Sequence, residues 1–160
     1  MVYGNTKSGR PLLGYGGKVL LMERGLHKKL APGMWFGIGG FIEPHEINSP
    51  ISACYREIEE ETGIEAENID NLELRYMTIQ YSDGAIEIMY YFIGALNHLY
   101  DLIDTDEGKL HWVDENDALD LPMSVPVKTI MKQWLSTPDE TGIMLCVIDS
   151  DNNAEWSKLS

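Results

Sequence analysis

The sequence predicts a mixed α/β fold in which β-strands surround two helices. The chain has 160 residues, of which 44% are hydrophobic and 24% charged, and this suits one globular domain with a sizeable core. Runs rich in β-branched and aromatic residues alternate with turn signals. Two further stretches space their apolar residues as helices do. The order of these elements indicates α/β rather than all-α or all-β architecture.

The acidic composition limits the partners that the chain is expected to bind. Lys and Arg number 12 and Asp and Glu 26, so the formal net charge is −14. A broad basic surface for a nucleic-acid backbone is therefore not expected, and an anionic substrate would need metal ions beside it. Residues 1–10 lack the apolar segment of a signal peptide, and no apolar run approaches the roughly 18 residues that span a bilayer. We expect a cytoplasmic protein that binds neither nucleic acid nor membrane.

The cysteines and histidines are typical of a reduced compartment. Cys54 and Cys146 form no C-x-x-C pair, so we expect them to serve as small buried hydrophobes. The four His residues contain no H-E-x-x-H pattern, which argues against a zinc site.

The first strands are expected on either side of a Gly-Gly turn. Residues 11–15 and 18–24 are apolar, and Gly16 and Gly17 between them predict a hairpin. The next ten residues are polar and broken by Pro and Gly, which predicts a loop. Residues 35–43 then place three glycines among apolar side chains. Glycine in a strand marks a bulge or a close approach to the backbone, so this stretch is the first indication of a ligand.

A helix is expected over residues 50–62. Ser49 can cap its free N–H groups, Pro50 suits the first helical position, and Gly63 can supply a left-handed C-terminal residue. One face of this helix is apolar, and it comprises Ile51, Cys54, Tyr55, Ile58 and Thr62. The helix is therefore expected to pack against a core.

The opposite face of the same helix is densely acidic, with Glu57, Glu60 and Glu61 spaced i, i+3 and i+4. A run such as Glu59 to Glu61 is usually a solvated face. These carboxylates lie in the second half of the helix, where the backbone dipole disfavours negative charge, and Arg56 offsets only part of the repulsion. A hard divalent cation would offset the rest, because Mg²⁺ prefers oxygen ligands and is commonly held by carboxylates together with substrate phosphates. The pattern therefore predicts a metal site.

The second half of the chain predicts two more hairpins and a second helix. The expected elements are strands at 72–82 and 85–96 joined by a turn at Asp83-Gly84, a polar loop at 101–108, a strand at 109–113, an acidic link at 114–122, a helix at 124–135 and a hairpin at 142–156. Pro126 is compatible with the second helix because proline is tolerated in a first turn.

Nine residues of the acidic helix and the loop before it resemble the Nudix box, G-x5-E-x7-R-E-U-x-E-E-x-G-U, in which U is aliphatic. They are Gly40, Glu46, Arg56, Glu57, Ile58, Glu60, Glu61, Gly63 and Ile64. Nine residues rather than seven separate Glu46 from Arg56, and we place the extra pair in the loop around Ile47 and Asn48. This insertion makes Glu46 a weaker candidate than the helical carboxylates. The order of elements over residues 12–136 is also similar to that of MutT-like Nudix proteins.

The resemblance implies a fold and a domain boundary. The family fold is an α/β/α sandwich with a mixed β-sheet, in which the box forms a loop-helix-loop catalytic motif. Residues 1–136 would form the Nudix domain. Residues 137–160 would be a C-terminal extension, a β-hairpin packed either on the same domain or on a partner subunit of a homodimer.

The resemblance also implies an activity. The family hydrolyses a nucleoside diphosphate linked to another group, X, with Mg²⁺ (or Mn²⁺) as cofactor. The first expectation is a MutT-type pyrophosphohydrolase acting on a (d)NTP or a modified nucleotide. The alternatives are an ADP-ribose or dinucleoside polyphosphate hydrolase, and a nucleotide-sensing Nudix module without catalysis. Such modules typically lose box carboxylates, and this chain retains them all, so catalysis is favoured.

Roles follow for the residues that match the motif. By similarity, Glu57, Glu60, Glu61 and the backbone carbonyl of Gly39 would bind metal, and the missing side chain of Gly39 would let the cation approach. Arg56 would hold the carboxylates in position, with a purely structural ion pair as the alternative.

The candidates for the general base and for the phosphate contact include residues outside the box. Glu57 is the first choice for the base that takes a proton from water, and Glu107, from a loop, is the second. Arg24, at the end of a strand, matches a position that meets phosphates in MutT-like proteins. The rival readings are a solvated acid for Glu107 and a surface charge for Arg24.

The aromatic residues give weaker indications of substrate. Trp35 and Trp112 can stack a base, although such residues are more often part of the core. Phe36 stands where one guanine-sanitising subfamily has a base-reading Asn. Tyr81 falls where dinucleoside polyphosphate hydrolases often carry a Tyr. These hints do not rank the substrates.

Overall fold

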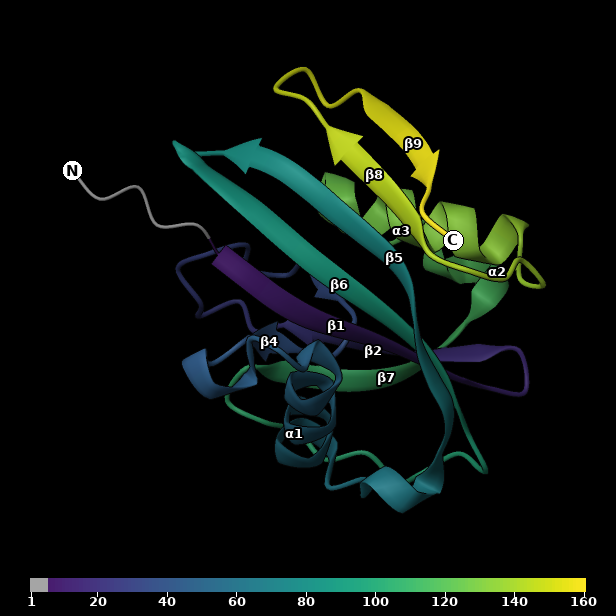
Figure 1. Ribbon diagram of the computed structural model, residues 1–160. Coiled ribbons are helices and arrows are strands. Elements are labelled where there is room, and N and C mark those ends of the chain that lie inside the picture. Colours follow the sequence, from purple (N-terminus) through teal and green to yellow (C-terminus); the bar gives the residue numbers. More distant parts are fainter. Residues whose placement is uncertain (1–5) are drawn as a thin grey trace.

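A computed structural model describes residues 6–160 (Figure 1). Residues 1–5 lie outside the described part. The expected domain over residues 1–136 and the expectation about a signal peptide in residues 1–10 both include them. The strands are β1 (Thr6–Tyr15), β2 (Lys18–Arg24), β3 (Trp35–Phe36), β4 (Gly40–Phe41), β5 (Ile69–Ser82), β6 (Ala85–Leu96), β7 (Gly108–Asp114), β8 (Met144–Ile148) and β9 (Ala154–Lys158). The helices are α1 (Pro50–Thr62), α2 (Glu115–Ala118) and α3 (Val125–Ser136), with single 3₁₀ turns η1 (Pro44–Glu46) and η2 (Ala66–Asn68).

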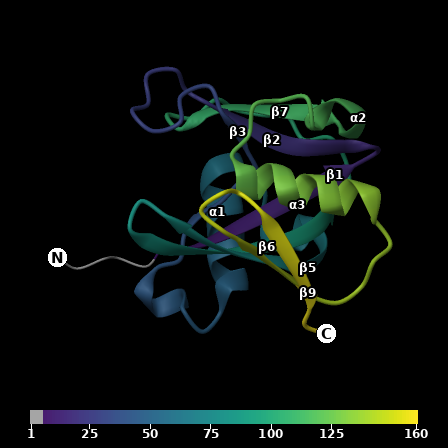
Figure 2. The same ribbon diagram turned by 90° about the horizontal axis from the view of Figure 1, so that it is seen from above.

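The strands form one mixed sheet, which confirms the predicted α/β class. Its order is β3-β2-β1-β6-β5-β8-β9, with β4 paired to β1 and β7 to β2. The pairs β1–β6 and β5–β8 are parallel, and the other pairs are antiparallel. Helices α1 and α3 lie on opposite faces of this sheet (Figures 1 and 2). Within residues 6–160, no helix is both long and apolar enough to cross a membrane.

Two apolar cores result from the alternation of side chains along the central strands. Leu13 of β1 and Leu20 of β2 belong to the core beneath α1, together with the buried Cys54 and Ile58 of that helix. Their chain neighbours point to the opposite face, where a second core packs against α3; it includes Leu12, Val19, Leu21, Val127, Ile130, Met131 and Trp134. Period-two alternation thus uses both faces of the same strands. The cores hold α1, with its acidic face outward, against the sheet.

Helix α1 has the predicted bounds. Pro50 occupies its first turn, and Gly63 follows it with φ of 74° and donates its N–H to the Glu59 carbonyl at 2.8 Å. Ser49 is the N-cap residue, but its side chain contacts the Ser52 hydroxyl at 2.9 Å and caps no backbone N–H. The expectation of a side-chain cap from Ser49 was therefore wrong, because a neighbouring hydroxyl engages it.

Some other elements differ from expectation in extent. Strand β1 begins at Thr6 rather than at residue 11, since its first half pairs in parallel with β6, a contact across eighty residues that no local pattern reveals. The glycine-rich segment 35–43 divides into the two-residue strands β3 and β4. The acidic link at 114–122 contains α2, which Asp114 caps by accepting the Asn116 N–H at 3.0 Å. The C-terminal hairpin joins the sheet of the same chain, with β8 beside β5.

Candidate functional site

An acidic cleft of about 700 Å³ lies where α1, the β4 segment, the end of β2 and the loop before β7 meet. Its lining residues are Arg24, Gly40, Phe41, Glu43, Arg56, Glu57, Glu60, Glu61, Thr105, Asp106 and Glu107. The cleft therefore brings six of the seven predicted site residues together, although they come from segments more than eighty residues apart. The seventh, Gly39, is one residue from the lining and hydrogen-bonds to Glu61.

Arg56 is the hub of this cleft. Its Nε and Nη2 donate to the two carboxylate oxygens of Glu46 at 2.7 and 2.9 Å, a paired geometry that strongly favours both charged forms. Its Nη1 donates to Glu57 at 2.7 Å and to Glu60 at 3.3 Å. Its Nη2 also reaches the Phe41 carbonyl at 3.1 Å. One guanidinium thus links the loop before α1 to two carboxylates on the helix.

Glu46 is fully part of this arrangement despite the insertion after it. Its side chain is buried, and its hydrogen bonds from Arg56 lower its pKa to about 2. The same bonds raise the pKa of Arg56. The extra residues lie in the exposed turn at Ile47 and Asn48, ahead of α1. The turn therefore contains the two extra residues and leaves the Glu46 carboxylate beside Arg56. The weaker candidacy of Glu46 for the site stays a prediction.

Gly40 makes room for Glu57. A Cβ atom at Gly40 would collide with the Glu57 carboxylate, which packs directly over the glycine backbone. The Glu57 side chain is 14% exposed, so it faces the cleft from a largely enclosed position. This steric fit explains why a residue without a side chain precedes the acidic loop.

Gly39 joins the loop to the helix through its backbone. Its N–H donates to Glu61 Oε2 at 3.1 Å, and its carbonyl accepts a 3.4 Å hydrogen bond from Arg10 Nη1. Its φ is 138°, and a Cβ there would collide with the Gly9 carbonyl of β1. The close approach of β1 thus gives this position a structural reason to be glycine.

Glu61 is held in an environment that disfavours its charge. Burial raises the pKa of this carboxyl to about 7, and the nearby Glu57 adds to the effect while the Gly39 N–H opposes it. Glu60, by contrast, is 60% exposed at the rim of the cleft. The three helical carboxylates therefore differ in their exposure to solvent, and this difference affects their pKa values differently.

Two loops meet across the mouth of the cleft through charged pairs. Glu107 accepts from Arg24 Nη1 at 3.5 Å and from Lys28 Nζ at 3.2 Å, and Lys28 also contacts Asp106 at 3.2 Å. The Nε of Arg24 donates to the Leu30 carbonyl at 2.6 Å. Lys28 is a basic residue of the site that sequence reasoning missed, since it lies in a loop with no spacing that relates it to Glu107.

The carboxylates on α1 are not the most tightly grouped acidic set in the described part of the chain. Among residues 6–160, Glu43, His45 and Glu46 are the group whose potential ligand atoms all lie within 4.8 Å of one another. Both carboxylate oxygens of Glu46 already accept from Arg56, and one also accepts the Glu43 N–H at 3.0 Å. These bonds occupy the oxygens that a metal would need. We therefore do not assign a metal to this group.

The predicted aromatic residues lie mostly in or beside the cores. Trp35 packs against the core beneath α3, and its ring centroid is 4.8 Å from that of His111. Trp112 packs against the other core and donates its indole N–H to the Tyr100 carbonyl at 3.0 Å. Phe36 lines a smaller cavity of about 350 Å³ that also contacts Arg24, Glu61 and Glu107. Tyr81 is 60% exposed and lines neither cavity.

Comparisons with known proteins agree with this geometry. Residues 9–135 match the family model described as NUDIX domain. The chain is similar to the "Uncharacterized Nudix hydrolase YvcI" of Bacillus subtilis (strain 168), with 32% identity over 109 residues, which cover 67% of this chain. The match spans 65% of that protein, slightly less than two thirds of its length.

Solved structures share the fold. The MutT protein of Bacillus halodurans superimposes with a TM-score of 0.68 and 24% identity, covering 95% of this chain and 96% of that one. The NUDIX domain of Shewanella oneidensis NrtR, solved in complex with ADP ribose, gives a TM-score of 0.65 at 18% identity, covering 86% and 90% of the two chains. At these identities the likeness establishes the fold alone.

Proposed function

Because the chain belongs to the Nudix hydrolase family, we propose that it is a hydrolase that cleaves a phosphoric anhydride bond in a nucleoside diphosphate linked to X. The observation that carries this proposal is the position of Arg56, which pairs with Glu57 and Glu60 in the lining of one cleft and is itself held by the buried Glu46. A purely solvated acidic face would not require a partly buried, bidentate pair between this arginine and Glu46 beside it. The first candidate substrate is a (d)NTP or a modified nucleotide, with release of pyrophosphate or phosphate.

The residues of the cleft fit a divalent cation. Six carboxylates line it (Glu43, Glu57, Glu60, Glu61, Asp106 and Glu107) against two guanidinium groups (Arg24 and Arg56). Carboxylate and carbonyl oxygens are the ligands that Mg²⁺ and Mn²⁺ prefer. We assign the cation to Glu57, Glu60, Glu61 and the Gly39 carbonyl. Such a cation would neutralise phosphate oxygens and lower the pKa of a bound water.

The protein's own side chains then divide the remaining tasks. Arg56 fixes the Glu57 carboxylate at 2.7 Å, and Glu57 takes the proton of the attacking water as general base. Glu107 is the second candidate for this role, and it is paired with Arg24 and Lys28. Arg24 and Lys28 supply positive charge at the mouth of the cleft, where they would orient the phosphates of an incoming nucleotide.

Two alternatives are supported by particular observations. Similarity to the NrtR domain, which was solved with ADP ribose, supports ADP-ribose as a second substrate class, and similarity to an Ap4A hydrolase of C. elegans supports dinucleoside polyphosphates beside it. A nucleotide-sensing module that binds without cleavage is the further alternative. The complete set of box carboxylates favours catalysis over sensing.

The proposal is tested with a panel of nucleoside triphosphates, ADP-ribose and dinucleoside polyphosphates, assayed for phosphate and pyrophosphate release with Mg²⁺. At least one compound should turn over, and Glu60→Gln should reduce its turnover while Glu59→Gln does not. Glu59 is the matched control because it is exposed on the same helix but does not line the cleft. Binding without turnover by the wild type would support the sensing module. Full activity of Glu60→Gln would show that the site is misplaced.

A further inference from the structure

Among the described residues, the sheet face on which α1 packs is uncovered over parts of three strands. In Figure 1, β5, β6 and β8 extend beyond α1, and α3 lies behind them. On the α3 side these strands carry the fully buried Tyr76, Tyr91 and Cys146. On the α1 side they carry seven apolar residues, which we call the open apolar face. Its members are Met77, Ile79, Tyr81, Ile86, Ile88, Leu145 and Val147.

The pairing register places these seven residues on one side of the sheet. Gly9 of β1 faces α1, because a Cβ there would contact that helix. Lys7, two residues earlier, faces the same side and pairs with Ile88 of β6. Ile88 pairs with Ile79 of β5, and Ile79 pairs with Val147 of β8. Since directly paired residues of neighbouring strands share a face, the alternate residues of each strand complete the set.

The open apolar face is exposed to an extent that is unusual for such side chains. None of its seven residues belongs to either apolar core of the described residues. Tyr81 is 60% exposed, Ile86 and Val147 are each 43% exposed, and the other four are half-buried. A sheet with one solvated face normally carries polar side chains on that face. Contiguous exposed apolar surface of this kind marks an interaction site.

The two rims of the open apolar face carry opposite charges in one row. Lys7 of β1 pairs with Ile88 at one rim, and Glu155 of β9 pairs with Val147 at the other. With Ile79 in the middle, the row crosses five adjacent strands from a cation to an anion. Within residues 6–160, neither Lys7 nor Glu155 has an oppositely charged partner within 4.0 Å. Both charges are therefore free to pair with another molecule.

We propose that the open apolar face binds a second copy of this chain, related by a two-fold axis parallel to the strands. Rotation about this axis reverses the row, so Lys7 of each copy meets Glu155 of the other. A two-fold axis across the strands would instead bring like charges together. The row is thus complementary to itself, which favours a second copy over an unrelated protein.

The face is large enough for such a contact. Five strands at about 4.8 Å spacing, each contributing about six residues of about 3.3 Å, form a face of about 24 by 20 Å. Two copies would remove on the order of 1,000 Å² from solvent, which is the lower limit for a specific interface. An interface of this size predicts a reversible dimer with a Kd of roughly micromolar order.

Sedimentation velocity of the full chain, from about 1 to about 300 μM, tests this proposal. The mass should rise with concentration from 18.1 kDa toward twice that value. Ile79→Lys places a charge at the centre of the face and should raise the Kd at least about 100-fold. Val147→Lys, at a more exposed position, tests the same point if the first variant does not fold. Leu99→Lys is the control, because Leu99 is 44% exposed outside the face, and it should leave the Kd unchanged.

Charge reversal at the rims tests the direction of the two-fold axis. Lys7→Glu and Glu155→Lys should each raise the Kd about tenfold, and the double variant should restore it. A wild type that stays monomeric at every concentration would overturn the proposal. A dimer unchanged by both Ile79→Lys and Val147→Lys would place association elsewhere, such as the edge of β9, and overturn it as well. Failure of the double variant to restore the Kd would overturn the proposed axis. None of these measurements needs a substrate, so their outcome is independent of the proposed hydrolysis.

Discussion

Arg56 holds together carboxylates that would otherwise repel one another. It contacts three carboxylates from two segments, and the planar guanidinium lets it do so with paired hydrogen bonds. The dipole of α1 disfavours negative charge at its C-terminal half. Arg56 offsets part of that cost, whereas Glu61, which also lines the cleft, has no ion pair within residues 6–160.

Arg56→Lys should therefore reduce kcat/KM by about 10- to 100-fold, the range found when a group that orients metal ligands is lost. A lysine keeps the charge but cannot span Glu46, Glu57 and Glu60 from one rigid plane. Steady-state kinetics with the substrate found by the panel measures this loss. Near wild-type kinetics would mean that Arg56 is only a structural ion pair.

The raised pKa of Glu61 predicts a pH dependence in the metal-free protein. Its folded-state pKa is about 7, against an ordinary value of 4.5. Between these values the folded state holds a proton that the unfolded state has lost, so the free energy of unfolding falls as pH rises through this window. Above about pH 7 the effect levels off.

Denaturant unfolding in EDTA, at about pH 5 and about pH 8, measures the fall. Glu61→Gln should shrink the difference between the two values, because the glutamine does not titrate. Since a cation competes with the proton, metal affinity should increase as pH rises through about 7. An unchanged pH slope in Glu61→Gln would contradict the assignment of the shift to this carboxyl.

At the scale of elements, α1 and the segment 35–43 are packed closely together. The absence of a side chain at Gly40 leaves space for the Glu57 carboxylate. The absence of one at Gly39 leaves space for the Gly9 carbonyl of β1, and the Gly39 N–H donates to Glu61. The glycines therefore set the distance between the loop and the acidic face of the helix. Their spacing relative to α1 is a steric requirement as well as a motif.

Gly40→Ala should keep the fold and lose activity. The added Cβ meets the far end of the Glu57 side chain, which can move aside at little cost to stability but no longer holds its carboxylate in place. Displacements of this size cost roughly 100-fold in rate. Gly63→Ala is the control, since nothing lies within 4 Å of its Cβ, and its φ of 74° costs roughly 1–2 kcal/mol of stability.

Local signals explain which elements could be predicted. The hairpin at Gly16-Gly17, the hairpin at Asp83-Gly84 and the bounds of α1 follow from turn residues and periodicity, both of which are properties of adjacent residues. The parallel pairing of β8 with β5 depends on contacts between residues far apart in the chain. The contact of Lys28 with Glu107 does too. The sequence pattern of a single segment does not indicate such long-range contacts.

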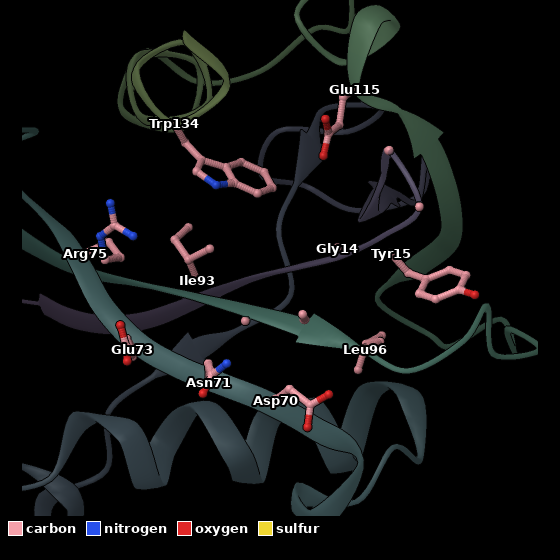
Figure 3. A pocket seen from close by; sticks show the side chains of 14 residues that line it. Gly14, Tyr15, Asp70, Asn71, Glu73, Arg75, Ile93, Leu96, Glu115 and Trp134 are labelled. Carbon is pink, nitrogen blue, oxygen red and sulfur yellow. The ribbon is translucent and has the colours of Figure 1, made fainter. Parts of the chain in front are cut away.

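At the scale of the whole molecule, the two long helices cover opposite faces of the sheet (Figures 1 and 2). Helix α1 lines the acidic cleft, and on the other face Trp134 of α3 lies near Ile93 of β6 (Figure 3). The net charge of −14 disfavours an anionic ligand that arrives without a cation. In the cleft, that cation would allow an anionic nucleotide to approach an acidic protein.

A titration of the full chain with Mn²⁺, followed by electron paramagnetic resonance, tests the central claim most directly. Glu57→Gln and Glu60→Gln should each weaken Mn²⁺ binding by about 10-fold or more, while Glu59→Gln and Glu43→Gln should bind as the wild type does. Unchanged affinity in the first two variants, with a loss in Glu43→Gln, would place the ion at Glu43, His45 and Glu46 instead and contradict the assigned site.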